Sequence, residues 1–200
     1  MSEEATVFVV DDDPAVLRSL VTLVKIIFPR VEAFVSAADF LAAYDPDRPG
    51  CLVLDVAMPG MSGLELQRKM AQEKIELPIV FITGHANVRM AVGAMQSGAV
   101  NFLEKPYQEQ ELWDSVRRAL EQDEQNRRRK ARRAEVEDRF DHLTSGEEDV
   151  LNLILEGKYN KEIAGQLSLS IRTVEDRRAR LMKKMGVESV AQLVQLALTR

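Results

Sequence analysis

The residues with the clearest chemical potential are polar side chains that directly follow short apolar runs. In chain order they are Asp11, Asp12, Asp13, Asp55, Thr83 and Lys105. Carboxylates that lie close together raise one another's pKa unless a cation neutralises them, and oxygen ligands with open positions favour Mg²⁺. An ionised aspartate beside Mg²⁺ and a lysine can attack a phosphoryl group, because both cations neutralise the developing charge. Thr83 could then hydrogen-bond a phosphoryl oxygen.

The apolar runs and the segments between them predict the elements that position these residues. Five runs are short enough for buried strands: Thr6–Val10, Val31–Phe34, Leu52–Leu54, Ile79–Ile82 and Ala99–Leu103. Five helical patterns alternate with them: Pro14–Ile27, Ala37–Tyr44, Gly63–Lys74, Asn87–Ser97 and Glu109–Gln122. This alternation predicts a doubly wound parallel sheet of five strands with helices on both faces. The polar residues would then meet beyond the carboxyl ends of the strands, at the switch point of the sheet.

The sequence that follows predicts helices only. Charged residues at helical spacing indicate an exposed linker helix over 121–142 that continues the preceding helix. A capping-box sequence at Thr144–Glu147 begins a further helix, which Gly157 ends. Three more follow: Asn160–Leu167, then after a tight turn Ile171–Met185, then Ser189–Thr199. We therefore predict a first domain over residues 1–120, a helical linker over 121–142, and an all-α four-helix helix-turn-helix domain over 143–200.

The charge of the chain is distributed unevenly between these regions. The formal net charge is −5, but residues 1–120 carry 11 basic and 17 acidic side chains, whereas residues 158–184 carry 8 basic and 3 acidic ones. The basic segment favours nucleic acid as a partner. The run Arg127–Arg133 could touch DNA phosphates or form a solvated helix face balanced by nearby acids.

The single cysteine and the absence of targeting signals indicate a reducing environment. Cys51 begins an apolar run, so we expect a buried structural thiol rather than a redox residue. The N-terminus does not have the pattern of a signal peptide, and no apolar stretch is long enough to span a bilayer. We expect a cytoplasmic protein that does not associate with membranes.

Over about residues 5–122 the sequence resembles the receiver domain of response regulators. The matching motifs are Val10-Asp-Asp-Asp-Pro14, Asp55-Val-Ala-Met-Pro-Gly60 with Ser62-Gly63, Thr83-Gly84 and Lys105-Pro106. The resemblance implies that Asp55 is the phosphoacceptor, and that Mg²⁺ binds Asp12, Asp55 and the carbonyl of Ala57, with Asp11 acting mainly through water. It also implies that Lys105 holds the phosphate and that Thr83 and Phe102 form a switch pair.

Over about residues 143–200 the sequence resembles the LuxR-type helix-turn-helix family. The matches are Leu143-Thr144, Glu147, Gly157, Asn160-Lys-Glu-Ile-Ala164, Leu167, Ser170, Thr173-Val174-Glu175, Lys184-Met185-Gly186-Val187 and Leu193-Val194. The two regions together resemble the FixJ subgroup. Gly146 stands where that family usually has Arg, so we expect a less firmly anchored start of the first helix of this domain. Arg177 stands where the family usually has His, which weakens the transfer of residue roles near it.

A helical wheel over 171–185 separates a core face from a face that could meet DNA. Val174, Leu181 and Met185 fall within a narrow arc and should face the core. The predicted DNA-binding residues are Arg172, Thr173, Glu175, Asp176, Ala179, Arg180 and Lys183. Glu175 and Asp176 lie near the helix start, where side chains meet base edges, and the basic residues would attract phosphates. The alternative is that the two acids only favour the helix dipole.

These observations predict a DNA-binding transcription factor that is switched by phosphotransfer from a sensor histidine kinase and that is not an enzyme. Phosphorylation would draw Thr83 toward the phosphate and turn Phe102 inward, which repacks the surface of the fourth predicted helix, the fifth strand and the fifth helix. This change would switch either dimerisation or exposure of the DNA-binding domain. Within that helix, 88–95 should expose Met and Ala beside Arg89 as a surface for a homodimer of the phosphorylated form. Double-stranded DNA is the second expected partner, and RNA polymerase is a further candidate. Ala57 and His85 should rim the phosphate and set its lifetime.

Two other classes of protein remain as alternatives. A phosphatase of the haloacid-dehalogenase type also has acids after its first strand, as in Asp11–Asp13, but needs a later acidic pair at a strand end. Glu109 and Glu111 instead lie in a helical pattern. The other alternative is a helical tail that binds protein, against which the outward basic residues of 171–184 argue. The sequence has no Gly-rich phosphate loop, so it does not imply an ATPase.

Overall fold

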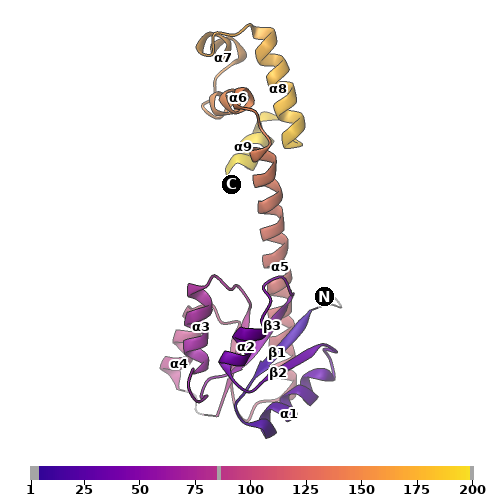
Figure 1. Cartoon of the computed structure of the whole chain (residues 1–200), viewed down its shortest axis with the longest axis vertical. Helices are drawn as coiled ribbons and strands as arrows, with labels where there is room; N and C mark the ends of the chain where they lie inside the picture. Colours follow the sequence, from indigo (N-terminus) through magenta and orange to yellow (C-terminus); the bar gives the residue numbers. More distant parts are fainter. Residues whose placement is uncertain (1–4, 85–86, 199–200) are drawn as a thin grey trace. The chain divides into compact units, whose positions relative to one another are not determined.

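The computed structural model describes residues 5–84 and 87–198 of the chain (Figure 1). The backbone divides into two compact units, of which the first ends at Arg127 and the second begins at Arg128. This division falls within the segment 121–142 that the sequence predicts as a linker. Among the described residues, no helix combines the length and the apolar character that a membrane crossing requires.

The described part of the first unit is built on a parallel sheet of five strands. They are β1 (Thr6–Val10), β2 (Val31–Phe34), β3 (Gly50–Asp55), β4 (Ile79–Thr83) and β5 (Asn101–Glu104). The strand order is β2-β1-β3-β4-β5, and each neighbouring pair is parallel. The chain runs outward from β1 to β2 and then returns to the other side of β1, so the switch point lies between β1 and β3. The predicted sheet is confirmed.

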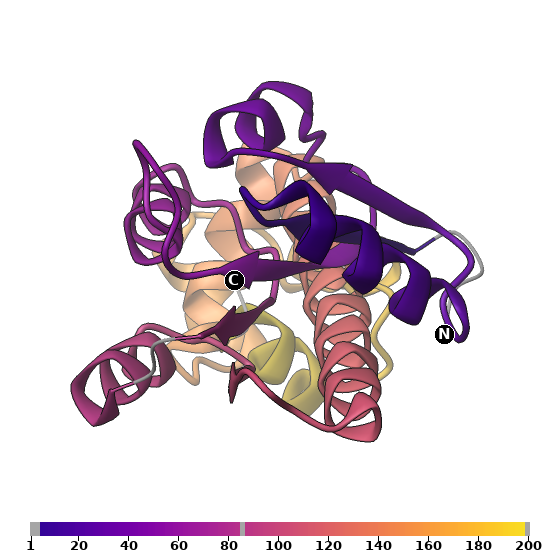
Figure 2. The same cartoon turned by 90° about the horizontal axis from the view of Figure 1, so that it is seen from below.

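Helices cover both faces of this sheet. They are α1 (Pro14–Lys25), α2 (Ala37–Ala43), α3 (Gly63–Gln72), α4 (Val88–Gln96) and α5 (Glu109–Asp141). Successive residues of a strand point to opposite faces, so Val7 and Val9 pack with α1 and α5, whereas Phe8 and Val10 pack with α2, α3 and α4. Figure 2 shows α1 and α5 on one side of the sheet and α3 and α4 on the other.

Several helix and strand ends differ by one or two residues from the sequence-based prediction; β3, for example, begins at Gly50 rather than at Leu52, and α1 ends at Lys25 rather than at Ile27. The strand expected at Ala99 begins at Asn101, because the chain first turns at Gly98, whose φ is +90°, and the Ala99 N–H bonds to the carbonyl of Ala94. The helix expected over Glu109–Gln122 and the expected linker helix form one continuous α5 that ends at Asp141. The expected continuation of one helix into the other is therefore confirmed.

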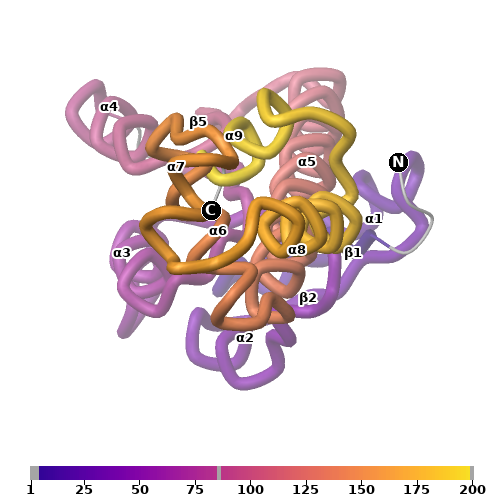
Figure 3. Tube along the Cα trace, turned by 90° about the horizontal axis from the view of Figure 1, so that it is seen from above, coloured from indigo at the N-terminus to yellow at the C-terminus, as the bar shows by residue number. Residues whose placement is uncertain are grey.

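The described part of the second unit holds four helices besides the end of α5. They are α6 (Ser145–Leu155), α7 (Asn160–Gln166), α8 (Ile171–Met185) and α9 (Val190–Leu198). Gly186, with φ of +66°, ends α8 in the left-handed conformation that suits a glycine. Val136 and Phe140 of α5 share a core with all four helices. Figure 3 views α8 along its axis with α6 and α7 beside it. The predicted four-helix domain is confirmed, although Thr199 lies outside the described residues.

Candidate functional sites

Two acids and one lysine meet at the carboxyl edge of the sheet. Lys105, which follows β5, places its Nζ 3.0 Å from Oδ2 of Asp11 and 2.9 Å from Oδ1 of Asp55. Asp11 follows β1 and Asp55 ends β3, so the two acids flank the switch point. Both are almost fully buried, with 2% and 6% of their surfaces exposed. The site is therefore a buried pair of carboxylates that share a single ammonium group.

The charges of this site are not balanced. Burial raises the pKa of Asp11, and hydrogen bonds from Lys105 and from the Asp13 N–H reverse only part of that effect. Burial also lowers the pKa of Lys105, but hydrogen bonds to Asp55 and Asp11 outweigh it and leave the pKa raised. The lysine therefore stays charged, and one positive charge serves two acids. The remaining negative charge favours binding of a further cation.

The backbone after Asp55 is shaped closely around this residue. The Ala57 N–H donates to Oδ2 of Asp55 at 2.7 Å, while Oδ1 of Asp55 accepts from Lys105. A side-chain carbon at Gly63 would lie 2.3 Å from the carbonyl oxygen of Asp55, so a glycine is needed where α3 begins. Ser62 caps α3 in a reciprocal pair with Glu65. These contacts fix both the orientation of the Asp55 carboxylate and the loop around it.

Of the other predicted site residues, Thr83 lies next to this cluster, because its carbonyl accepts the Lys105 N–H at 2.8 Å. Asp12 is exposed, and among the described residues no group of three Asp, Glu, His or Cys side chains is gathered to hold a metal ion. Thr83 is fully buried at the end of β4. Phe102 is half-buried, with its ring 5.9 Å from that of Phe81. His85 lies outside the described residues. The nearby Asp13 accepts from the Ala15 N–H as the N-cap of α1.

The exposed face of α4 differs in part from the predicted one. Ala94 is 1% exposed and Met90 packs against the same core, because the two are one helical turn apart on the side that faces the sheet. The exposed apolar residues are instead Val88, Val92 and Met95. The expectation of an exposed Met–Ala surface is therefore wrong for Met90 and Ala94. An exposed apolar face beside Arg89 is present, and it is formed chiefly by valines.

The second candidate site is the exposed face of α8. Val174, Leu181 and Met185 are fully buried, as the helical wheel predicts. On the other side the exposed residues are Arg172, Glu175, Asp176, Ala179, Arg180 and Lys183. Thr173 is half-buried, and its N–H donates to Oγ of Ser170 at 3.1 Å, which caps the helix start. The face opposite the core is therefore free to meet a ligand, with two acids near the start of the helix.

The other basic residues of α8 hold the unit together. Arg178 donates to Oδ1 of Asn160 at 2.8 Å, which links α8 to the start of α7. Lys184 lies 2.6 Å from Oε2 of Glu147, which is only 4% exposed, and also bonds to the carbonyl of His142. The predicted DNA-binding residues include neither Arg178 nor Lys184, but sequence analysis assigned these two residues no structural role, because a local count of charge does not show what a basic side chain contacts.

The start of α6 is anchored, contrary to the expectation from Gly146. The Thr144–Glu147 capping box is complete, and Arg177 Nη1 donates to the carbonyl of Gly146 at 3.3 Å. A side-chain carbon at Gly146 would lie 2.5 Å from that same guanidinium nitrogen. The space left by the glycine is thus filled by the arginine of α8. The two departures from the family pattern compensate for each other in space.

A doubly wound sheet with a lysine-linked acid pair at its switch point, followed by a helix-turn-helix unit, defines the class of two-domain DNA-binding regulators. Residues 7–117 match the family described as response regulator receiver domain, and residues 141–197 match the family of bacterial regulatory proteins of the luxR type. The chain belongs to the response regulators with a LuxR-type DNA-binding domain. It is a transcriptional regulator of a two-component system, which implies a histidine kinase and DNA as partners.

Curated relatives match over nearly the whole chain. Nodulation protein W of Bradyrhizobium diazoefficiens is 42% identical over 99% of this chain and 87% of its own length. Response regulator protein TodT of Pseudomonas putida is 42% identical, with 98% and 87% covered. Transcriptional regulatory protein FixJ of Azorhizobium caulinodans is 41% identical, with 99% and 94% covered. All three resemble this chain in both domains.

Solved structures share the fold of this chain. The response regulator StyR is 42% identical and aligns with a TM-score of 0.88 over 98% of this chain and 100% of its own. Full-length FixJ from B. japonicum is 36% identical and aligns with a TM-score of 0.60 over 99% and 98%. The fold predicted from the sequence is therefore that of experimentally known relatives.

Proposed function

We propose that Asp55 accepts a phosphoryl group from a phosphohistidine of a sensor histidine kinase, and that this event controls DNA binding. The observation that carries the proposal is the Lys105 ammonium shared between Asp11 and Asp55. An oxygen of the Asp55 carboxylate attacks phosphorus, and a P–O bond forms as the P–N bond breaks. The electron pair returns to the imidazole of the kinase. Lys105 is placed to neutralise charge on the transferred group.

We also propose that Mg²⁺ assists this transfer. The donors are all oxygens: the carboxylates of Asp12 and Asp55, the carbonyl of Ala57, and Asp11 through water. The uncompensated negative charge at Asp11 and Asp55 fits a divalent cation. Mg²⁺ needs only one or two protein carboxylates when waters and a phosphate complete its shell, so a preformed cluster of three acids is not required. When bound, the ion would neutralise charge that develops on the phosphoryl oxygens.

The response to phosphorylation would pass through Thr83 and Phe102. The Thr83 hydroxyl would bond a phosphoryl oxygen, and the half-buried Phe102 ring would move into the space beside Phe81. The α4 surface would then repack and support a homodimer. In the second unit, the exposed face of α8 would enter the major groove of double-stranded DNA, and RNA polymerase is a further proposed partner. Because these partners lie inside the cell, we place the protein in the cytoplasm.

The test of this function uses Asp55→Asn, which keeps the shape of the side chain but removes its charge. We expect acetyl phosphate to label the wild-type chain only when Mg²⁺ is present, and not to label the variant. Labelling of Asp55→Asn as strong as that of the wild type would contradict the assignment. A steady-state phosphatase assay addresses the dehalogenase alternative. Glu109 and Glu111 lie in the first turn of α5 rather than at a strand end, so we expect no turnover.

A further inference from the structure

The last two turns of α5 within the first unit are held by polar contacts alone. Leu120 is the last buried apolar residue of α5 in this unit, and the next buried apolar residue of the helix is Val136. Between them, in the described helix, the single buried residue is Asp123, which is 5% exposed. Whatever fixes α5 after Leu120 must therefore act through Asp123 and its neighbours.

Arg127 binds this part of α5 to the loop between α2 and β3. Its guanidinium donates to three consecutive backbone carbonyls, at 3.0 Å for Pro46, at 3.1 Å for Asp47, and to that of Arg48. Nε of Arg127 donates to Oδ2 of Asp123 at 2.8 Å, which orients the guanidinium. A planar fork with donors on three nitrogens suits such a row of carbonyls, whereas the three donors of a lysine ammonium are all on one nitrogen.

Asp123 extends the same contact to the sheet. Its Oδ2 accepts the N–H of Gly50 at 2.9 Å, and Gly50 is the first residue of β3, the strand that ends at Asp55. Gly50 lies so close to β1 that a side-chain carbon at this position would be 2.1 Å from the carbonyl oxygen of Thr6. We name the pair of Asp123 and Arg127, with their partners in 46–50, the α5 clamp.

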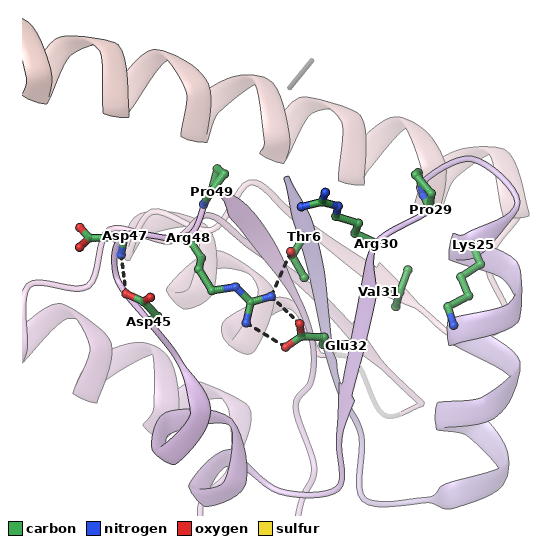
Figure 4. Close-up of a pocket in the computed structure, with 10 residues that line it drawn as sticks. All are labelled: Thr6, Lys25, Pro29, Arg30, Val31, Glu32, Asp45, Asp47, Arg48 and Pro49. Atoms are coloured by element: carbon green, nitrogen blue, oxygen red, sulfur yellow. Dashed lines mark hydrogen bonds and ion pairs between the residues drawn. The ribbon is translucent and has the colours of Figure 1, made fainter. Parts of the chain in front are cut away.

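The loop that the α5 clamp grips is itself fixed. The side chain of Arg48 is paired with Glu32 of β2 and donates to the Thr6 hydroxyl at 3.2 Å (Figure 4). Its guanidinium carbon also lies 5.2 Å from the centre of the Phe8 ring. The Asp47 N–H donates to Oδ1 of Asp45 at 2.9 Å. The α5 clamp therefore joins the helix to a rigid part of the first unit.

We infer that Arg127 is a positioning residue that fixes the point at which α5 leaves the first unit and thereby makes DNA binding responsive to phosphorylation. The inference rests on the function proposed above. The compact first unit ends at Arg127, which is itself part of the α5 clamp. α5 continues from the first unit into the second. A change at the phosphorylated site can therefore reach the second unit along α5 only if the helix keeps a defined orientation where it leaves the first unit. Without the α5 clamp, motion of the helix would average that orientation out.

The test compares the full-length wild-type chain with Arg127→Ala, Arg127→Lys and Arg132→Ala. Arg132 is a matched control because it is an exposed arginine of the same helix and its side chain has no hydrogen bond or ion pair among the described residues. A DNA fragment selected by the wild-type chain from a random pool serves as the probe. Its affinity is measured with and without beryllofluoride and Mg²⁺, and acetyl phosphate labelling is measured separately.

We call the DNA affinity with beryllofluoride and Mg²⁺, divided by the affinity without them, the activation ratio. We expect Arg127→Ala to be labelled like the wild type, while its activation ratio falls below about half of the wild-type value. The activation ratio of Arg127→Lys should lie between those of Arg127→Ala and the wild type, and Arg132→Ala should keep the wild-type ratio. In hydrogen exchange, the Gly50 amide should exchange faster in Arg127→Ala. A merely structural role would lower the melting temperature and leave the ratio unchanged.

Two outcomes would overturn the inference in distinguishable ways. If Arg127→Ala keeps more than about half of the wild-type ratio, or if its Gly50 amide exchanges at the wild-type rate, the α5 clamp does not couple the units. If the wild-type chain binds DNA equally well with and without beryllofluoride and Mg²⁺, the inference fails together with the proposed control of DNA binding. The labelling experiment then shows whether phosphorylation of Asp55 also fails.

Discussion

Asp11 illustrates at the scale of one residue how a site can hold charge at the expense of stability. Its carboxylate is buried beside Asp55, and Lys105 cannot fully neutralise both acids. Burial raises the pKa of Asp11 above 3.8, so the folded chain binds this proton more tightly than the unfolded chain does. Such a group lowers stability at pH values above its folded pKa, and the penalty disappears as the pH falls through that pKa.

Asp11→Asn should therefore be more stable than the wild type at pH 7. The advantage should shrink as the pH is lowered toward 3.8. Urea unfolding at several pH values measures both effects, and labelling by acetyl phosphate should be weaker in the same variant because a predicted Mg²⁺ contact is lost. An Asp11→Asn protein that is less stable than the wild type at pH 7 would show that the acid stabilises the fold.

At the scale of one element, α8 carries basic residues with two different roles. Lys183 is exposed and its side chain has no hydrogen bond or ion pair among the described residues, whereas its neighbour Lys184 is paired with the buried Glu147. The hydrogen bond from Lys184 is the largest cause of the lowered pKa of Glu147. A lowered pKa gives stability that is complete above 4.5 and is lost as the pH falls through the folded value.

The two adjacent lysines therefore make a matched pair of variants. Lys184→Ala should lower the free energy of unfolding by about 1–3 kcal/mol at pH 7, with a smaller loss in acid, because it leaves a buried carboxylate without its cation. Lys183→Ala should leave stability unchanged and reduce the salt dependence of DNA binding by a slope of about 1. Thermal unfolding and binding at several salt concentrations check both. Equal effects of the two substitutions on stability would contradict the division of roles.

The acids at the start of α8 are predicted to select a base rather than to hold the backbone. A carboxylate repels phosphates but can accept a hydrogen bond from a cytosine amino group. Asp176→Ala should change the preference at one base pair by about 1–3 kcal/mol. Competition among operator variants that differ at single positions measures this change. If Asp176→Ala and Glu175→Ala raise the affinity for every sequence alike, the acids act only on general charge and do not read bases.

The elements of this chain follow from local patterns, whereas several of its decisive contacts do not. Apolar runs give β1 and β2 their observed bounds, and Gly186 marks the end of α8. The cluster of Asp11, Asp55 and Lys105 is also predictable, because parallel strands bring their carboxyl ends to one edge. The Gly146–Arg177 contact is different, since it joins residues 31 positions apart whose types suggest no pairing.

The same limit applies to α5 and α4. Helical spacing predicts the Asp123–Arg127 pair, which the structure contains at 2.8 Å. It cannot reveal that Arg127 also binds carbonyls about 80 positions earlier, because backbone acceptors are present in every sequence. On α4, the side of the helix that meets the sheet depends on the angle at which it packs. That angle decides that Met90 is covered while Val88 and Val92 are exposed.

At the scale of the whole molecule, the exposed valines of α4 are the strongest reason to expect a phosphorylation-dependent homodimer. Val88 is 81% exposed and Val92 is 48% exposed, so burial of this face against a second copy would remove apolar surface from water. Size-exclusion chromatography should show a monomer without beryllofluoride and a dimer with it. Val92→Asp should prevent the dimer because it would bury an unpaired charge at the interface. Val35→Asp is the matched control, since Val35 is also an exposed valine of the first unit but lies after β2. A dimer that forms equally well in Val92→Asp and in the control would mean that another surface joins the two copies.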